Sequence, residues 1–138
     1  MSLDPVRVAD TKEWFKEAQE DIRAAEILCC ATPPLYDHSA NLCQQAVEKT
    51  LKGFLFWHTN KRPQKTHDLN VLGDKCVAID SSLTSLIGQA TPLTQYAVES
   101  KYPGIIEHPS LAEVEGMIDI VKTLFAKILS LMPSVINP

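Results

Sequence analysis

The strongest structural signal in the chain is the stretch from Tyr36 to His58, YDHSANLCQQAVEKTLKGFLFWH. Its apolar side chains recur every three or four residues, which is the spacing of one face of an α-helix. The face predicted to be buried carries Cys43, Ala46, Val47, Thr50, Leu51, Phe54 and Leu55. The opposite face is predicted to carry Gln45, Glu48, Lys49 and Lys52, with Glu48 and Lys52 forming a favourable i,i+4 pair.

The segment before this helix has the same period. From Thr11 to Ala31 the apolar stripe comprises Trp14, Ala18, Ile22, Ala25 and Leu28/Cys29. Thr11 is predicted to be the N-cap of this helix, and Pro33-Pro34 is predicted to stop the chain from continuing it.

The segments after it are also helical in pattern. A short helix is predicted from its cap at Thr66 to about Asp80, and a further one from Ser81, interrupted at Thr91-Pro92 because proline breaks the helical hydrogen bonding. A long final helix, capped by Ser110, is predicted to end near Met132. With no alternating β pattern, the sequence predicts an all-α fold, an antiparallel four- to five-helix up-and-down bundle. We expect one domain over residues 1–138, with a core of about 11–132 and flexible ends at 1–10 and 133–138.

The charge of the chain is unevenly distributed. The formal net charge of −4 argues against a high-affinity, nonspecific nucleic-acid binder, which draws most of its affinity from basic side chains. All 17 carboxylate side chains nevertheless lie outside the stretch between Lys49 and His67. That stretch contains the basic residues Lys49, Lys52, Lys61, Arg62 and Lys65. It is either a solvated face or a local site for an anion.

Targeting and metal-binding patterns are not visible in the sequence. The first residues carry an acid and a proline where a secretory signal would be apolar, and the longest apolar run, Phe54–Trp57, is too short to span a bilayer. The four cysteines show no C-x-x-C spacing and the histidines no H-x3-H spacing. We therefore expect a cytoplasmic protein with reduced thiols, no metal, no cofactor and no membrane contact.

Four ordered blocks of sequence together resemble the HEPN domain family. They are Trp14 with Ala18 and 21–25, the block 44–49 with Leu51-Lys52, the block 65–69 with Leu72, and Leu93 with 96–99 running into 102–104. The resemblance implies a helical bundle that is frequently a homodimer and is often encoded beside a minimal nucleotidyltransferase. The family includes metal-independent ribonucleases and members without catalytic activity.

Catalytic members of that family carry an R-x(4–6)-H motif near the start of a late helix. By position, the better match is Lys101 with His108, where lysine replaces the usual arginine and supplies a point charge instead of a bidentate fork. By spacing, Arg62 and His67 also fit. In either pair the histidine would move a proton and the cation would face the phosphate, where negative charge builds in the transition state.

Three functions follow from these observations as hypotheses. The first is a dimeric binding or regulatory module of a toxin–antitoxin-like pair with a nucleotidyltransferase, holding a nucleotide or RNA. Its candidate anion-binding residues are Lys61, Arg62, Lys65, His67, Lys101 and Tyr102. The second is a metal-independent endoribonuclease, and the third is a scaffold dimer without a ligand. Structural alternatives stand beside them: His67 can hydrogen-bond a neighbouring helix, His108 can be a solvated loop residue, and the polar face of the block 44–49 can bond between helices.

Overall fold

The computed structural model describes residues 3–97 and 108–138 and confirms the all-α fold. In these residues we find helices and no strand. The elements are α1 (Pro5–Cys29), α2 (Tyr36–Thr59), α3 (Leu69–Ile79), η1 (Ser81–Leu83), α4 (Thr84–Ala90), η2 (Thr91–Tyr96), α5 (Leu111–Ser130) and η4 (Ser134–Ile136).

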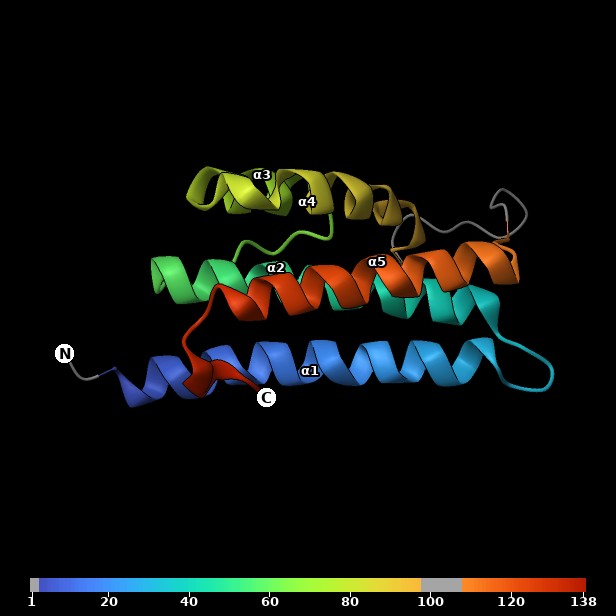
Figure 1. Cartoon of the computed structure of the whole chain (residues 1–138), viewed down its shortest axis with the longest axis horizontal. Coiled ribbons are helices and arrows are strands. Elements are labelled where there is room, and N and C mark those ends of the chain that lie inside the picture. Colours follow the sequence, from blue (N-terminus) through green and yellow to red (C-terminus); the bar gives the residue numbers. More distant parts are fainter. Residues whose placement is uncertain (1–2, 98–107) are drawn as a thin grey trace.

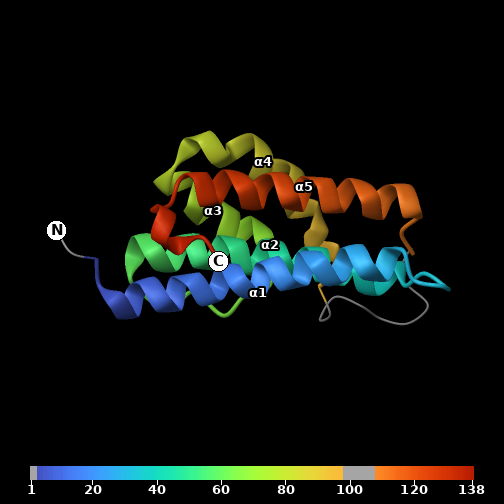
Figure 2. The same cartoon turned by 60° about the horizontal axis from the view of Figure 1, so that its bottom comes forward.

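The two longest helices, α1 and α2, pack side by side as an antiparallel pair, and α5 lies along both of them (Figure 1). The shorter α3 and α4 cover α2 and α5 from the side away from α1 (Figures 1 and 2). The end of α1 and the starts of α2 and α5 therefore meet at one end of the bundle. The connection from α2 to α3 leaves from the other end.

Helix α1 begins at Pro5, six residues before the predicted start at Thr11. Asp4 is the N-cap, because its carboxylate accepts a hydrogen bond from the Val6 amide, and Pro5 occupies the first turn, where its missing N–H costs nothing. Thr11 is instead buried within the helix, with its hydroxyl donating to the carbonyl of Arg7 at 2.6 Å. The predicted flexible segment 1–10 thus includes the first turns of α1.

The opposite end of the chain also differs from the expected flexible tail. After α5, η4 folds back against α1, and Ile136 is fully buried in the core. The prediction for the start of α5 is confirmed: the Ser110 hydroxyl accepts from the Glu113 amide, and the Glu113 carboxylate accepts from the Ser110 amide, both at 3.2 Å.

The buried face of α1 is centred on Phe15, whereas the sequence pattern favoured its neighbour Trp14, which is only partly buried. Phe15 packs edge-on against Phe125 of α5, with ring centroids 6.2 Å apart. Gly53 of α2 lies opposite. A Cβ at that position would come within 2.9 Å of the Cβ of Trp14, so glycine is what permits α1 and α2 to approach this closely.

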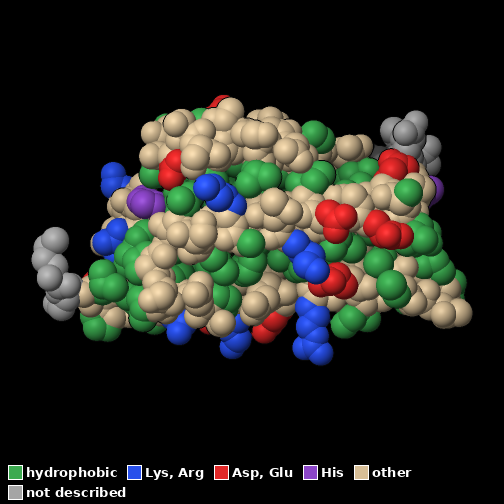
Figure 3. Space-filling view, in the orientation of Figure 1, with side chains coloured by type: hydrophobic (Ala, Val, Ile, Leu, Met, Phe, Trp, Pro, Cys, Tyr) green, Lys and Arg blue, Asp and Glu red, His purple; other side chains and the backbone are tan. Residues whose placement is uncertain are grey.

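Charged side chains are distributed unequally over the surface. On the face seen in Figure 3, acidic side chains gather toward the end of the bundle where α5 begins. None of the helices in the described residues combines the length and the apolar character needed to cross a membrane.

Candidate functional site

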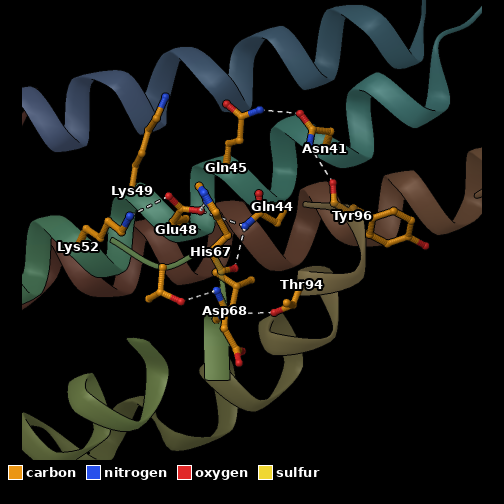
Figure 4. A network of polar contacts seen from close by, with 12 residues as sticks. Asn41, Gln44, Gln45, Glu48, Lys49, Lys52, His67, Asp68, Thr94 and Tyr96 are labelled. Carbon is orange, nitrogen blue, oxygen red and sulfur yellow. Dashed lines mark hydrogen bonds and ion pairs between the residues drawn. The ribbon is translucent and has the colours of Figure 1, made fainter. Parts of the chain in front are cut away.

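A polar network joins α2 to the connection that follows it. Glu48, on the second half of α2, accepts hydrogen bonds from the Lys52 ammonium at 2.9 Å and from the Gln44 amide at 3.2 Å. Its Oε1 atom also lies 2.8 Å from Nδ1 of His67 (Figure 4). The Gln44 amide reaches the backbone carbonyl of His67 at 3.3 Å. Four functional groups from two segments therefore hold one another in place.

Glu48 and Lys52 are buried, although the sequence pattern placed them on the face of α2 opposite the buried stripe. Their exposed fractions are 9% and 8%. Burial raises the pKa of Glu48, but the hydrogen bonds from Lys52, His67 and Gln44 together outweigh it, so the pKa lies below its ordinary value. Glu48 is consequently a carboxylate at neutral pH, and its charge compensates that of the Lys52 ammonium.

A second ion pair links α2 to α1. The Lys49 ammonium lies 2.8 Å from the carboxylate of Asp21. Burial of Asp21 raises its pKa, and Lys49 offsets only part of that effect. Two of the five cations in the basic stretch are therefore neutralised by carboxylates of α1 and α2. The interpretation of the polar face of the block 44–49 as interhelical bonding agrees with these contacts.

The connection between α2 and α3 is held at both ends. Asn60 ends α2 in the left-handed conformation, with φ of 52°. Asp68 is the N-cap of α3, accepting from the Asn70 amide at 2.9 Å, whereas the sequence predicted Thr66 in that role. The Thr66 hydroxyl accepts from the Asp68 amide at 3.1 Å, and the Leu69 amide donates to Thr94. His67 is thus presented from a fixed backbone.

The remaining cations of the basic stretch, Lys61, Arg62 and Lys65, are exposed on this connection. Lys61 and Arg62 border a hollow of about 380 Å³ between the ends of α2 and α3. Lys75 of α3 borders the same hollow and donates to the side chain of Gln64 at 2.7 Å. No carboxylate is among the described residues that line it.

Arg62 also borders a second hollow of about 350 Å³ against α1, where three carboxylates lie. The residues lining it with Arg62 are Asp10, Glu13, Trp14, Glu17, Phe56 and Pro63. Neither hollow includes His67, whose ring is directed to Glu48. Although Arg62 and His67 have the right spacing in sequence, the structure places them in different surroundings.

His108 lies at the other end of the bundle, just before α5. Its Nδ1 atom is 2.6 Å from Oδ2 of Asp37 in the first turn of α2, and 77% of the imidazole is exposed. This contact engages one of the two ring nitrogens of a side chain that is otherwise largely exposed. Its predicted partner Lys101 and the anion-binding candidate Tyr102 lie outside the described residues.

Asp37 is the candidate residue that sequence reasoning missed. It is 71 positions from His108, and no motif or spacing connects the two. The sequence contained a weak indication that Glu48 is buried. Its i,i+4 spacing from Lys52 places an opposite charge nearby, as a buried carboxylate requires. Among the described residues, no group of three or more His, Cys, Asp or Glu side chains has the arrangement of a metal site.

Comparison with known proteins bears on the whole chain. Searches of curated proteins and of solved structures gave no match. The family described as HEPN domain matches residues 11–131, which cover most of α1 and all of α2 to α5 and include every candidate residue discussed above. The match covers most of the chain and agrees with the all-α architecture. The chain belongs to the HEPN domain family.

Proposed function

We propose that this protein is a nucleotide- or RNA-binding regulatory module that acts as a homodimer. Membership of the HEPN family supports a nucleotide- or RNA-related role. The proposal adds a location: an anionic ligand binds at the basic connection between α2 and α3. It also adds a partner of the kind found in toxin–antitoxin pairs, a minimal nucleotidyltransferase.

One observation supports this location above the others. Lys61, Arg62 and Lys65 are exposed on a connection anchored at both ends, and Lys75 adds a fourth cation from α3. Lys49 and Lys52 contribute little to it, because carboxylates already neutralise them. A phosphate group is the common anion that several such cations can hold together.

The helix ends beside the hollow between α2 and α3 do not themselves attract an anion. The hollow lies beside the C-terminal ends of α2 and α3, where the helix dipoles disfavour an anion. The basic side chains must therefore provide the favourable electrostatic energy. Binding should accordingly be sensitive to salt and to the removal of these side chains.

The test is a binding titration with fluorescently labelled single-stranded RNA and, separately, with ATP. The variant Lys61→Ala/Arg62→Ala/Lys65→Ala removes the three exposed cations of the connection. A matched control, Lys12→Ala/Lys16→Ala/Arg23→Ala, removes the same charge from exposed positions on α1.

We expect affinity to fall about tenfold or more in the connection variant and to change little in the control, since each phosphate contact carries a share of the salt-dependent energy. Equal losses in the two variants would show that only net charge matters. Unchanged melting temperature at millimolar ATP and no RNA binding would remove the proposal altogether.

The proposed dimer and partner have their own tests. Light scattering should give twice the 15.3 kDa mass of the chain at micromolar concentration. Coexpression with a nucleotidyltransferase from the neighbouring reading frame should yield a complex that survives size-exclusion chromatography. A strictly monomeric chain that does not bind such a protein would contradict this part of the proposal.

A second function, a metal-independent endoribonuclease, is favoured by the contact between His108 and Asp37. Asp37 orients the imidazole through Nδ1, and the other ring nitrogen of this largely exposed side chain would take the proton of a ribose 2′-hydroxyl or give one to the leaving oxygen. In a dimer, two such histidines would serve as base and acid. We place Lys101 as the cation facing the phosphate.

The ribonuclease proposal is tested with purified protein and RNA in EDTA. Cleavage should occur without metal and should be lost in His108→Ala. If cleavage survives that substitution but is lost in His67→Ala, the motif is the Arg62–His67 pair instead. Intact RNA across a wide range of protein concentration would eliminate the enzyme and leave the binding module.

A further inference from the structure

Two adjacent thiols lie at the end of α1, remote from the basic connection. The Sγ atoms of Cys29 and Cys30 are 3.7 Å apart. Both residues line a hollow of about 450 Å³ between α1 and α5. Cys30 is exposed, whereas Cys29 is 7% exposed and donates to the carbonyl of Glu26 at 3.3 Å. The pair therefore offers two sulfur atoms to one opening.

The surroundings of the pair restrict which reagents can reach and bind it. Glu26, Glu115 and Asp119 contribute carboxylates to the lining, and Leu111 and Ile118 contribute apolar surface. Figure 3 likewise shows acidic side chains gathered toward the end of the bundle where α5 begins. Because Glu26 is paired with the Lys122 ammonium at 3.4 Å, Glu115 and Asp119 supply the excess negative charge. An anionic reagent such as oxidised glutathione is repelled by that charge, whereas a neutral molecule is not.

The protonation state of Cys29 further restricts the class of ligand that the two thiols can bind. Burial, the neighbouring Cys30 thiol and the carboxylates of Glu115 and Glu26 raise its pKa. The sulfur therefore stays protonated near neutral pH, which disfavours a metal cation that must displace the proton. The described residues, moreover, hold no three-ligand group suited to a metal ion. A reagent that takes up the thiol protons itself avoids this cost.

We propose that Cys29 and Cys30 form a dithiol site for neutral compounds of trivalent arsenic. The reaction is a condensation: two As–S bonds form, two As–OH bonds of arsenous acid break, and each hydroxide leaves as water with one thiol proton. Arsenic remains trivalent, so no oxidant or reductant is required. Bridging needs two sulfurs close together on one accessible surface, which the 3.7 Å separation provides.

The other two thiols do not offer this chemistry. Cys43 is 1% exposed and Cys76 is fully buried, and burial raises the pKa of each to about 12. Cys76 is also on α3 and donates to the carbonyl of Leu51. The site is therefore specific to the end of α1.

The experiment uses the full reduced chain and phenylarsine oxide, which loses its oxygen as water when it bridges two thiols. Intact-mass spectrometry should show one phenylarsenic group per chain, removed by 2,3-dimercaptopropanol but not by an equal concentration of 2-mercaptoethanol. Cys30→Ser, a change at an exposed position, should weaken binding by roughly tenfold or more, because the second bond no longer forms within the chain. Cys76→Ala is the control and should retain the adduct.

An adduct in Cys30→Ser that resists 2-mercaptoethanol as it does in the unmodified chain would overturn the proposal. So would removal of the unmodified chain's adduct by 2-mercaptoethanol alone, since that indicates one As–S bond. A parallel titration with Cd²⁺ separates the two kinds of ligand. Tight Cd²⁺ binding that depends on Cys30, without an arsenical adduct, would identify a metal-cation site instead.

Discussion

Replacing Glu48 with glutamine should destabilise the protein strongly, although the side chain keeps its size. The substitution removes the negative charge that Lys52 and His67 face. Lys52 is 8% exposed, so its ammonium would remain buried beside a neutral amide. Leaving one member of a buried ion pair uncompensated typically costs several kcal/mol.

We expect a loss of about 3 kcal/mol in the free energy of unfolding at pH 7. This value is at the lower end of the range of about 3–5 kcal/mol for breaking a buried ion pair, because the amide oxygen of the introduced glutamine can still accept one hydrogen bond. For a chain of this length the loss corresponds to a decrease of about 12 °C in melting temperature. Urea unfolding followed by circular dichroism measures the first quantity, and thermal unfolding measures the second.

The pH dependence gives an independent check. The pKa of Glu48 is lower in the folded state than in the unfolded chain, so its ionisation stabilises the fold above the unfolded pKa of about 4.3. That stability is lost as the pH falls through the folded pKa. The difference in stability between the unmodified chain and Glu48→Gln should therefore narrow below about pH 4.

Lys52→Met supplies the matched control. Once the buried ammonium is gone, Glu48→Gln should cost at least about 1 kcal/mol less than in the unmodified chain. A loss below about 1 kcal/mol in Glu48→Gln, or equal losses in both backgrounds, would refute the account of the network as a buried, mutually compensating ion pair.

Two further predictions concern packing and the second proposed site. Gly53→Ala should destabilise the chain despite a helix-propensity gain of about 1 kcal/mol, because the new Cβ meets Trp14. Gly116→Ala has open space and should raise the free energy of unfolding by about 0.5–1 kcal/mol in the same urea assay. A stabilised Gly53→Ala would contradict the close approach of α1 and α2. If RNA is cleaved in EDTA, Asp37→Ala should lower the rate about 10²-fold or more without abolishing the fold, and an unchanged rate would show that the contact with His108 plays no part in catalysis.

The helices could be predicted from the sequence because their apolar period is local information. The period did not determine which of two adjacent aromatic residues faces inward. Trp14 and Phe15 differ by one step of the helix, and the close contact at Gly53 and the ring of Phe125 favour Phe15. The early start of α1 was marked by Asp4-Pro5, a cap signal that the stronger stripe after Thr11 obscured.

The candidate sites depend on contacts that sequence spacing cannot supply. The i,i+4 pairing with Lys52 was only a weak indication that Glu48 is buried, and the contact with His67 and the packing around α2 establish it. The cluster of basic residues could be recognised from the sequence alone. The sequence did not show that Lys49 is paired, because its partner Asp21 lies on α1. Asp37 and His108 meet only because α2 and α5 begin at the same end of the bundle.

The central claim is that the exposed cations between α2 and α3 hold a nucleic acid or nucleotide. The salt dependence of RNA binding tests this claim most directly. For single-stranded RNA, the slope of log affinity against log salt changes by about 0.7 for each phosphate contact. Removing Lys61, Arg62 and Lys65 together should therefore make the slope shallower by about 2, whereas the α1 control should keep the slope of the unmodified chain. An unchanged slope and affinity in the connection variant would contradict the claim.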